Sequence, residues 1–213
     1  MSIISLNFLI FMALTCGAYY LLPKRMQWIV LLAASLVFYL SYGVKPLGYL
    51  LFTALTTFTA GILMGRINTR LASYLENNSS QSREKKKAAK AAARNRKRRI
   101  LAAAVLCNIG MLGAVKFAGH LGPVLGSLLG RPGYGAEGPL SWLVLTLGVS
   151  FYVFQTVGYV TDVYRGIIEP ARSFPRYLLF VCFFPQLLQG PISRYEQLYP
   201  QLIQPRELFC PKP

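Results

Sequence analysis

Residues 183–202 read FFPQLLQGPISRYEQLYPQL, a composition that suits neither a membrane-spanning helix nor an ordinary soluble loop. The segment follows an apolar run, yet its twenty positions contain three prolines, four glutamines and one glycine. Pro185 removes a helical hydrogen bond and disfavours helix at Phe184, and Gly190-Pro191 interrupts the chain again. The sequence therefore predicts irregular backbone beside an apolar segment.

The apolar run from Tyr177 to Gln189 is about a dozen residues long, which is short of the roughly 20 that a helix needs to cross hydrocarbon. Non-helical backbone at membrane depth persists only where protein encloses it or where it lines a wet cavity. We therefore expect a re-entrant or broken helical element over 177–202, sheltered by other helices. Gln186 and Gln189 could satisfy the freed backbone groups, and Arg194 could meet headgroups or an anionic ligand.

The rest of the chain has the composition of a membrane protein. Of its 213 residues 54% are hydrophobic, and the mean hydropathy is +0.42, too apolar for an ordinary soluble domain. The turn-like GVKP between the second and third apolar runs predicts a tight hairpin. We expect an all-α, polytopic membrane protein with about five transmembrane helices, at about 4–22, 27–43, 46–64, 100–119 and 139–161.

The positive charge is concentrated between two of these predicted spans. The formal net charge is +16, and residues 65–99 hold twelve of the 23 lysines and arginines against Glu76 and Glu84. Because cytoplasmic loops collect Lys and Arg, this basic loop predicts an orientation with 65–99 and 162–176 inside and the N-terminus outside. Part of the loop, 83–99, is rich in helix-forming residues and predicts a helical extension of the fourth span. Its positive charge predicts attraction to membrane lipids. Because it contains no aromatic residue that could stack on bases, we expect no nucleic acid partner.

One face of the fifth predicted span is polar. Tyr152, Tyr159 and Asp162 lie at −3, +4 and +7 from Gln155, so the four share a helical face. Polar groups in hydrocarbon are costly without partners, so this face should point to the protein interior or to an aqueous cavity. Two interpretations stay open: an interhelical hydrogen-bond seam with an Asp162–Arg165 ion pair at the inner boundary, or a cavity lining.

The sequence has no arrangement of metal ligands or catalytic groups. The four cysteines, at 16, 107, 182 and 210, are scattered without metal-type spacing and are expected to be buried free thiols. His120 is the single histidine, and we expect it at the surface near the outer boundary. We therefore predict neither a metal site nor a bound cofactor.

Several segments in order along the chain resemble the bacterial membrane-bound O-acyltransferases, in the branch of the alginate O-acetyltransferase and of the protein that D-alanylates teichoic acid. The opening segment resembles the family's Phe-Pro-Gln-Leu-x-x-Gly-Pro-Ile motif. LTLGVSFYVFQTVGYVTDVYRG (145–166) is similar to its Leu-Gly-x-Ser-Phe-x-x-Phe-Gln segment, which ends in Asp-x-Tyr-Arg-Gly. Residues 32–66 resemble its early helical hairpin, and NIGMLGAVKF (108–117) resembles the start of its fourth segment.

The resemblance implies a ring of membrane helices around a thinned, funnel-like centre. There an acyl group of acetyl or D-alanyl type, from a cytoplasmic-side acyl-CoA or acyl-carrier thioester, would reach hydroxyls of an exported polysaccharide or envelope polymer. The family's catalytic histidine lies in a later Trp-His segment that His120 does not match, so no residue of this chain inherits a catalytic role. What carries over is the scaffold of the funnel, as cavity-lining candidates: Gln155, Tyr159, Asp162, Pro185, Gln186, Gly190, Pro191 and Arg194.

The resemblance also implies a partial fold. The expected parts are 1–64 with three transmembrane helices, 65–99 as the basic loop, 100–166 with two more helices, and 167–213 with the broken element and a truncated C-terminus. We expect the chain to be inactive alone, in the inner membrane of a bacterial cell. Its expected partners are a C-terminal half or second chain that bears the histidine and an extracytoplasmic transferase or hydrolase-like protein. The alternatives are a non-catalytic scaffold subunit or a truncated remnant. A small transporter is a third alternative, but it would predict an internal repeat, and the sequence shows none.

Overall fold

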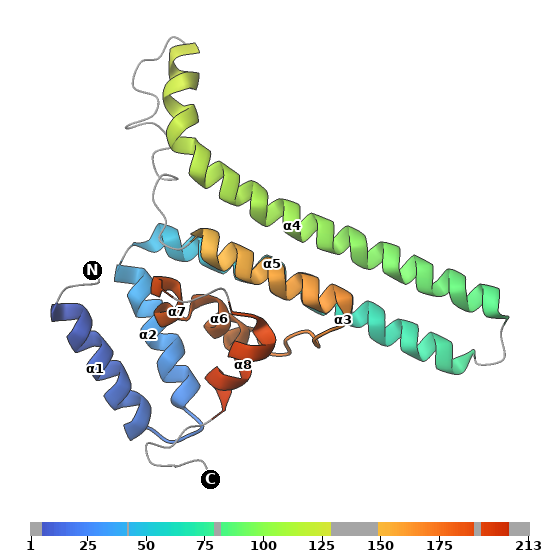
Figure 1. Ribbon diagram of the computed structural model, residues 1–213, viewed down its shortest axis with the longest axis horizontal. Coiled ribbons are helices and arrows are strands. Elements are labelled where there is room, and N and C mark those ends of the chain that lie inside the picture. Colours follow the sequence, from blue (N-terminus) through green and yellow to red (C-terminus); the bar gives the residue numbers. More distant parts are fainter. Residues whose placement is uncertain (1–5, 42, 79–81, 129–148, 190–192, 205–213) are drawn as a thin grey trace.

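The structure is a computed structural model that describes residues 6–41, 43–78, 82–128, 149–189 and 193–204. These residues are helical, without a strand in any of the five ranges, so the predicted all-α class is confirmed. The helices run in the following order (Figure 1): α1 (Leu6–Leu21), α2 (Gln27–Ser41), α3 (Val44–Asn77), α4 (Arg83–Leu128), α5 (Val149–Arg165), α6 (Phe174–Cys182), α7 (Phe184–Gln189) and α8 (Tyr195–Ile203).

The predicted hairpin is formed by α2 and α3. Gly43 caps α3 with φ 120° and ψ 162°, a conformation open essentially to glycine alone. Pro46 falls in the first turn of α3, where its missing N–H is not needed. On the other side of α2, the rings of Phe8 and Phe11 in α1 pack against Phe38, with centroids 6.2 and 6.4 Å apart. The three N-terminal helices therefore form one packed unit.

The basic segment 65–99 is mostly helix rather than loop. α3 is 34 residues long and continues to Asn77, and α4 begins at Arg83, so the predicted helical extension of the fourth span is present. Figure 1 shows these basic halves of α3 and α4 projecting as an antiparallel pair beyond the other helices. α5 packs along the apolar halves of both. Across the same pair, the amide of Asn108 donates to Thr56 Oγ1 at 3.1 Å.

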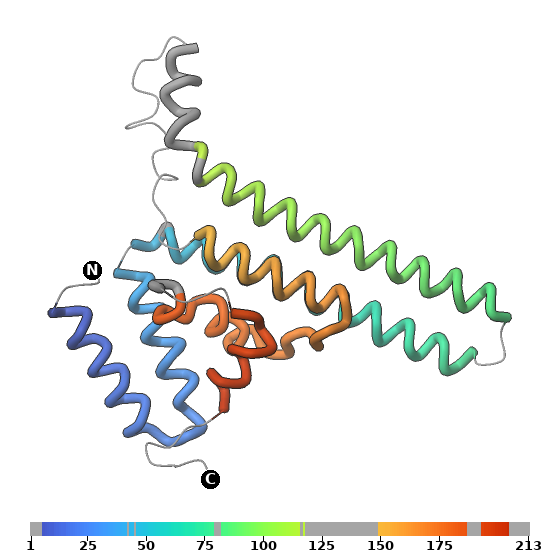
Figure 2. Tube along the Cα trace, in the orientation of Figure 1, coloured from blue at the N-terminus to red at the C-terminus, as the bar shows by residue number. Residues whose placement is uncertain are grey.

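Residues 174–203 form three short helices, and the segment 183–202 covers α7 and nearly all of α8. α6 contacts α2, α3, α5 and α8, and every residue of 177–182 is buried. The helix is interrupted at Phe183 (φ −57°, ψ 102°), one residue earlier than the proline pattern predicts, and Pro185 lies in the first turn of α7. Figure 2 shows α6, α7 and α8 folded back on one another beside α2. The predicted break is therefore present between α6 and α7, and neighbouring helices enclose residues 177–182 before it, whereas Glu196 and Gln197 of α8 are exposed.

The outer faces of the helices are apolar, as in a membrane protein. Leu14, Leu55 and Leu106 are each more than half exposed to the surroundings of the chain. Two described helical stretches are long and apolar enough to cross a membrane, Pro46–Asn77 and Arg83–Val115, whereas α1 and α2 are apolar but shorter, at 16 and 15 residues. The count of five spans remains a prediction, since residues 139–148 of the fifth lie outside the described ranges.

The cysteines differ from expectation. Cys182 is buried, but Cys16 and Cys107 are exposed because they lie on the outward faces of α1 and α4. The prediction of burial is therefore wrong for these two residues. Their segments are apolar enough for either environment, so hydropathy could not separate a lipid-facing side from a protein-facing side. Cys210 lies outside the described residues, and so does the side chain of His120.

Candidate functional site

The polar face of α5 points into the protein, against α6. Tyr152, Gln155 and Tyr159 are 0%, 3% and 1% exposed. The Gln155 amide donates from Nε2 to the carbonyl oxygen of Phe180 at 3.3 Å, which ties α5 to the centre of α6. This is the geometry of an interhelical hydrogen-bond seam, one of the two interpretations that the sequence left open.

The predicted ion pair at the end of this face is absent. Asp162 is half-buried, and among the described residues no cation lies within 4.0 Å of its carboxylate. Arg165 is exposed on the last turn of α5. Residues three apart on a helix can approach each other, but an ion pair gains little where water reaches both groups, so a spacing rule overestimates such pairs.

Tyr159 is fixed from three sides. Its hydroxyl accepts a hydrogen bond from the backbone N–H of Ala171 at 2.9 Å, and its ring lies 4.7 Å from that of Tyr177 and 4.9 Å from that of Tyr195. On the fourth side it approaches α3 at Gly61, where a Cβ would lie 2.6 Å from the tyrosine oxygen. Close packing of α3 against α5 therefore depends on a glycine at position 61.

Tyr177 continues this network from α6 into α3. Its hydroxyl and Thr57 Oγ1 are 2.8 Å apart, and both are buried. The hydroxyl of Thr57 lies 2.6 Å from the carbonyl oxygen of Thr53, to which it can donate, which leaves Thr57 Oγ1 as the acceptor for Tyr177. Four members of this network were not predicted as site residues: Thr57, Gly61, Tyr177 and Tyr195. A threonine and a glycine one helical turn apart are common on apolar helices, so the sequence alone does not single out Thr57 and Gly61.

Some buried polar atoms in this region have no partner. Among the described residues, the hydroxyls of Tyr39 and Tyr152 and Oε1 of Gln155 make no hydrogen bond. An unsatisfied buried polar atom costs about 1–3 kcal/mol, so natural folds retain few of them and often at functional positions. These three atoms are therefore the part of the seam whose burial is not offset by a hydrogen bond.

The remaining described candidates lie on α7 and at the start of α8. Pro185 lines a groove of about 300 Å³ between α1, α2, α7 and α8, and Gln186 is buried at 8% exposure. Arg194 is exposed at the start of α8. Gly190 and Pro191 lie outside the described residues. A cavity-lining role for these residues therefore stays a prediction, as it does for Gln155, Tyr159 and Asp162.

The described residues hold no cluster of three metal-ligating His, Cys, Asp or Glu side chains. The site so far is a packed seam of tyrosines, glutamines and threonine hydroxyls. Such groups position helices and accept or donate hydrogen bonds. None of these side-chain types is a usual general base or an activated nucleophile.

The chain is similar to bacterial O-acetylases over most of its length. It is 31% identical over 195 residues to the "Probable alginate O-acetylase AlgI" of Azotobacter vinelandii, a match that covers 90% of this chain and 34% of that protein. The protein of the same name from Pseudomonas putida is 28% identical over 194 residues, with coverages of 90% and 35%. A peptidoglycan O-acetyltransferase of Helicobacter pylori is 31% identical over 28% of this chain and 16% of its own length.

The chain thus spans about a third of the length of the alginate O-acetylases that it matches. Neither a family model nor a solved structure matches it.

Proposed function

We propose that this chain, a relative of the membrane-bound O-acyltransferases, forms the N-terminal helical wall of an enzyme that acetylates hydroxyls of an exported polysaccharide or envelope polymer. The observation that carries the proposal is the match over 90% of the chain to alginate O-acetylases. The relatives' names favour an acetyl group over a D-alanyl group, because both kinds of relative are named for O-acetylation.

The wall would be built from the seam described above. α6 is enclosed by α2, α3, α5 and α8, and the bonds from Gln155 to Phe180 and from Tyr177 to Thr57 tie it to α5 and α3. Short helices that stop inside a protein are what a thinned centre requires, since backbone breaks must be enclosed. The seam would therefore fix the shape of the funnel rather than perform the chemistry.

The acetyl donor would approach from the side that carries the basic ends of α3 and α4, which we propose to be cytoplasmic in a bacterial inner membrane with the N-terminus outside. Basic segments favour that side. The donor would be acetyl-CoA or an acyl-carrier thioester. We propose that the chain alone is inactive and that the histidine acting as general base comes from chain beyond these 213 residues. An extracytoplasmic protein would assist transfer of the acetyl group to the acceptor.

A chimera tests this proposal. Residues 1–213 replace the matching third of the Azotobacter vinelandii relative, and the acetyl content of the exported polymer is measured in cells that lack the native enzyme. We expect the chimera to restore acetylation and this chain alone to leave the polymer unacetylated. A chimera that is inserted in the membrane in normal amounts, while the polymer stays unacetylated, would contradict the proposal and favour a non-catalytic scaffold.

A split version controls for poor assembly. This chain and the remaining two thirds of the relative are expressed as separate chains, each with its own affinity tag, beside the relative split at the same point. We expect the two pieces to purify together, as those of the split relative do. Absence of association, when the split relative does associate, would count against the proposed wall.

A further inference from the structure

A cationic groove lies where α4 passes the end of α5. It has a volume of about 410 Å³, and its lining contains no acidic residue. The lining comes from three helices and consists of Leu71, Lys90, Ala93, Arg94, Lys97, Tyr164 and Arg165. The seam and the proposed acetyl transfer make no use of these residues.

The groove is built by helical spacing. Lys90, Arg94 and Lys97 follow one another at four and three residues, so they lie on one face of α4, around the buried Ala93. Arg165 faces them from the last turn of α5. Lys97 is half-buried, and its Nζ lies 5.8 Å from the centroid of the Tyr164 ring, a distance at which a cation and an aromatic face attract. Lys97 is therefore held in place rather than extended into solvent.

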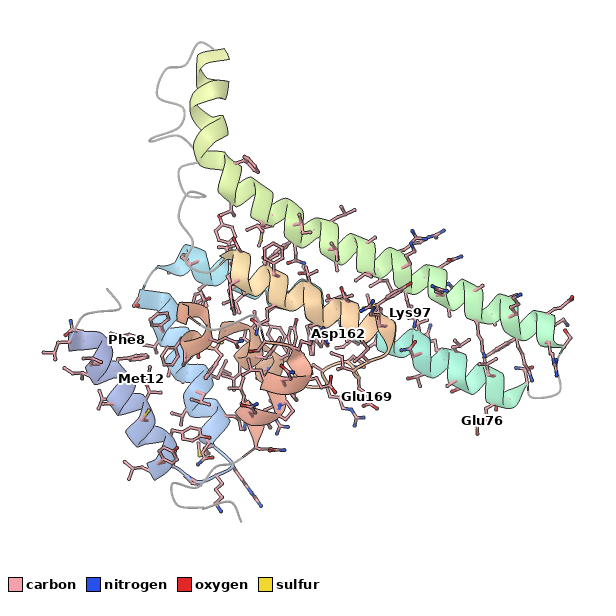
Figure 3. All side chains as sticks on the ribbon, viewed as in Figure 1. Phe8, Met12, Glu76, Lys97, Asp162 and Glu169 are labelled. Atoms are coloured by element: carbon pink, nitrogen blue, oxygen red, sulfur yellow. The ribbon has the colours of Figure 1, made fainter. Side chains whose placement is uncertain are left out.

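None of the four cationic side chains of the groove forms an ion pair with a described carboxylate. The carboxylate closest in sequence is that of Asp162, one turn before Arg165, and no described cation lies within 4.0 Å of it. Figure 3 shows Lys97 beside the end of α5 that carries Asp162, with Glu76 far along the projecting helix pair. Glu169 lies outside the groove, where it pairs with Arg172 at 3.0 Å. The groove thus presents four cationic side chains toward a single space.

All three helices change from apolar to basic at the level of this groove. The apolar part of α3 ends before Arg66, that of α4 begins after Arg99, and that of α5 ends before Arg165. In a membrane protein, this is the level of the lipid headgroups, where tyrosine and basic residues are common. The negative surface potential of anionic lipids attracts basic residues at this level.

We propose that the groove binds a phosphate group, that of an anionic phospholipid headgroup. Lys90, Arg94, Lys97 and Arg165 would surround the phosphate oxygens, with charge-assisted hydrogen bonds from the guanidinium groups. Leu71 and Ala93 supply an apolar side against which the glycerol and first methylenes can lie. The same chemistry would accept the phosphate of a soluble molecule, and the two sources are separable by experiment.

The test uses the purified chain in neutral detergent, with short-chain phosphatidylglycerol, short-chain phosphatidylcholine and inorganic phosphate as probes, and binding measured by native mass spectrometry and by the shift in melting temperature. The groove variant is Lys90→Gln/Arg94→Gln/Lys97→Gln. The matched control, Lys85→Gln/Lys87→Gln/Arg99→Gln, removes the same charge from the same helix outside the groove lining. Arg165→Gln tests the groove from the other helix.

We expect phosphatidylglycerol to bind more tightly than phosphatidylcholine, and the groove variant to weaken that binding by about tenfold or more against less than about twofold for the control. Arg165→Gln should weaken it in the same direction. If inorganic phosphate binds and only the groove variant abolishes that binding, the phosphate site is supported and its ligand comes from a soluble source. Equal losses in the groove and control variants, or no preference for phosphate-bearing probes of net negative charge, would overturn the proposal.

Discussion

Replacement of Gly61 by alanine is expected to separate α3 from α5. A Cβ at this position would lie 2.6 Å from the hydroxyl oxygen of Tyr159 and 3.2 and 3.3 Å from Cε1 and Cζ of its ring. The ring has little room to retreat, because it packs against Tyr177 and Tyr195 and its hydroxyl is bonded to the N–H of Ala171 at 2.9 Å. The new methyl group must therefore displace a helix or distort the seam.

The magnitude is the difference between two opposing effects. Alanine in a helix is more favourable than glycine by about 0.8–1 kcal/mol, whereas overpacking a core costs about 1–3 kcal/mol. Gly158→Ala isolates the first effect, since nothing lies within 4 Å of a Cβ at that position on α5. We expect Gly61→Ala to be less stable than Gly158→Ala by about 1–3 kcal/mol, which corresponds to a melting temperature lower by about 2–12 °C.

The assay is thermal unfolding in detergent micelles, followed by circular dichroism and by the fraction that stays monodisperse after heating. The double variant Gly61→Ala/Tyr159→Phe removes the atom in closest contact. It should therefore lose less stability than the sum of its two single variants, because residues in direct contact are not additive. Gly61→Ala as stable as Gly158→Ala, or strict additivity in the double variant, would refute the packing described for α3 and α5.

Three further changes should lower the melting temperature in the same assay. Gly43→Ala places a side chain at φ 120° and should cost about 1–3 kcal/mol; an unchanged melting temperature would show that the hairpin turn differs. Phe184→Ala removes a ring 5.4 Å from that of Phe11 and should cost about 3–5 kcal/mol, with faster proteolysis around α7 as an independent sign; resistance equal to the native chain would argue against the packing of α7 on α1. Tyr177→Phe should cost about 0.6–1.5 kcal/mol, and combination with Thr57→Val should add little, since either change removes the 2.8 Å bond; a fully additive pair would exclude that bond.

The sequence predicted the helical class, the hairpin at residue 43 and the broken element, because each depends on local chemistry. Proline and glycine limit where a helix can run, and the break at Phe183 falls one residue from the expected position. The inward direction of Tyr152, Gln155 and Tyr159 also follows from local spacing, since a polar stripe on an apolar helix is costly unless protein covers it.

The partners of that stripe could not be predicted. Which residues of α3 and α6 meet it depends on how distant segments pack, and Thr57 and Gly61 are indistinguishable from their neighbours in the sequence alone. The Asp162–Arg165 pair was expected from spacing and is absent, because helical proximity does not oblige two partly exposed side chains to pair. The exposed Cys16 and Cys107 show the same limit, as an apolar segment has a lipid side and a protein side that hydropathy does not distinguish.

The enclosure of residues 177–182 of α6 by the surrounding helices is open to a direct chemical measurement. Two single-cysteine versions of the chain, one that retains Cys182 on α6 and one with Glu196→Cys on α8, are treated with a membrane-permeant maleimide before and after denaturation. Cys182 is 0% exposed and Glu196 is exposed, so the structure predicts rapid labelling at 196 and labelling at 182 slower by about 100-fold or more until the chain is unfolded. Equal labelling rates at both positions in the folded chain would mean that the segment is a detached tail, and the enclosed wall would not exist.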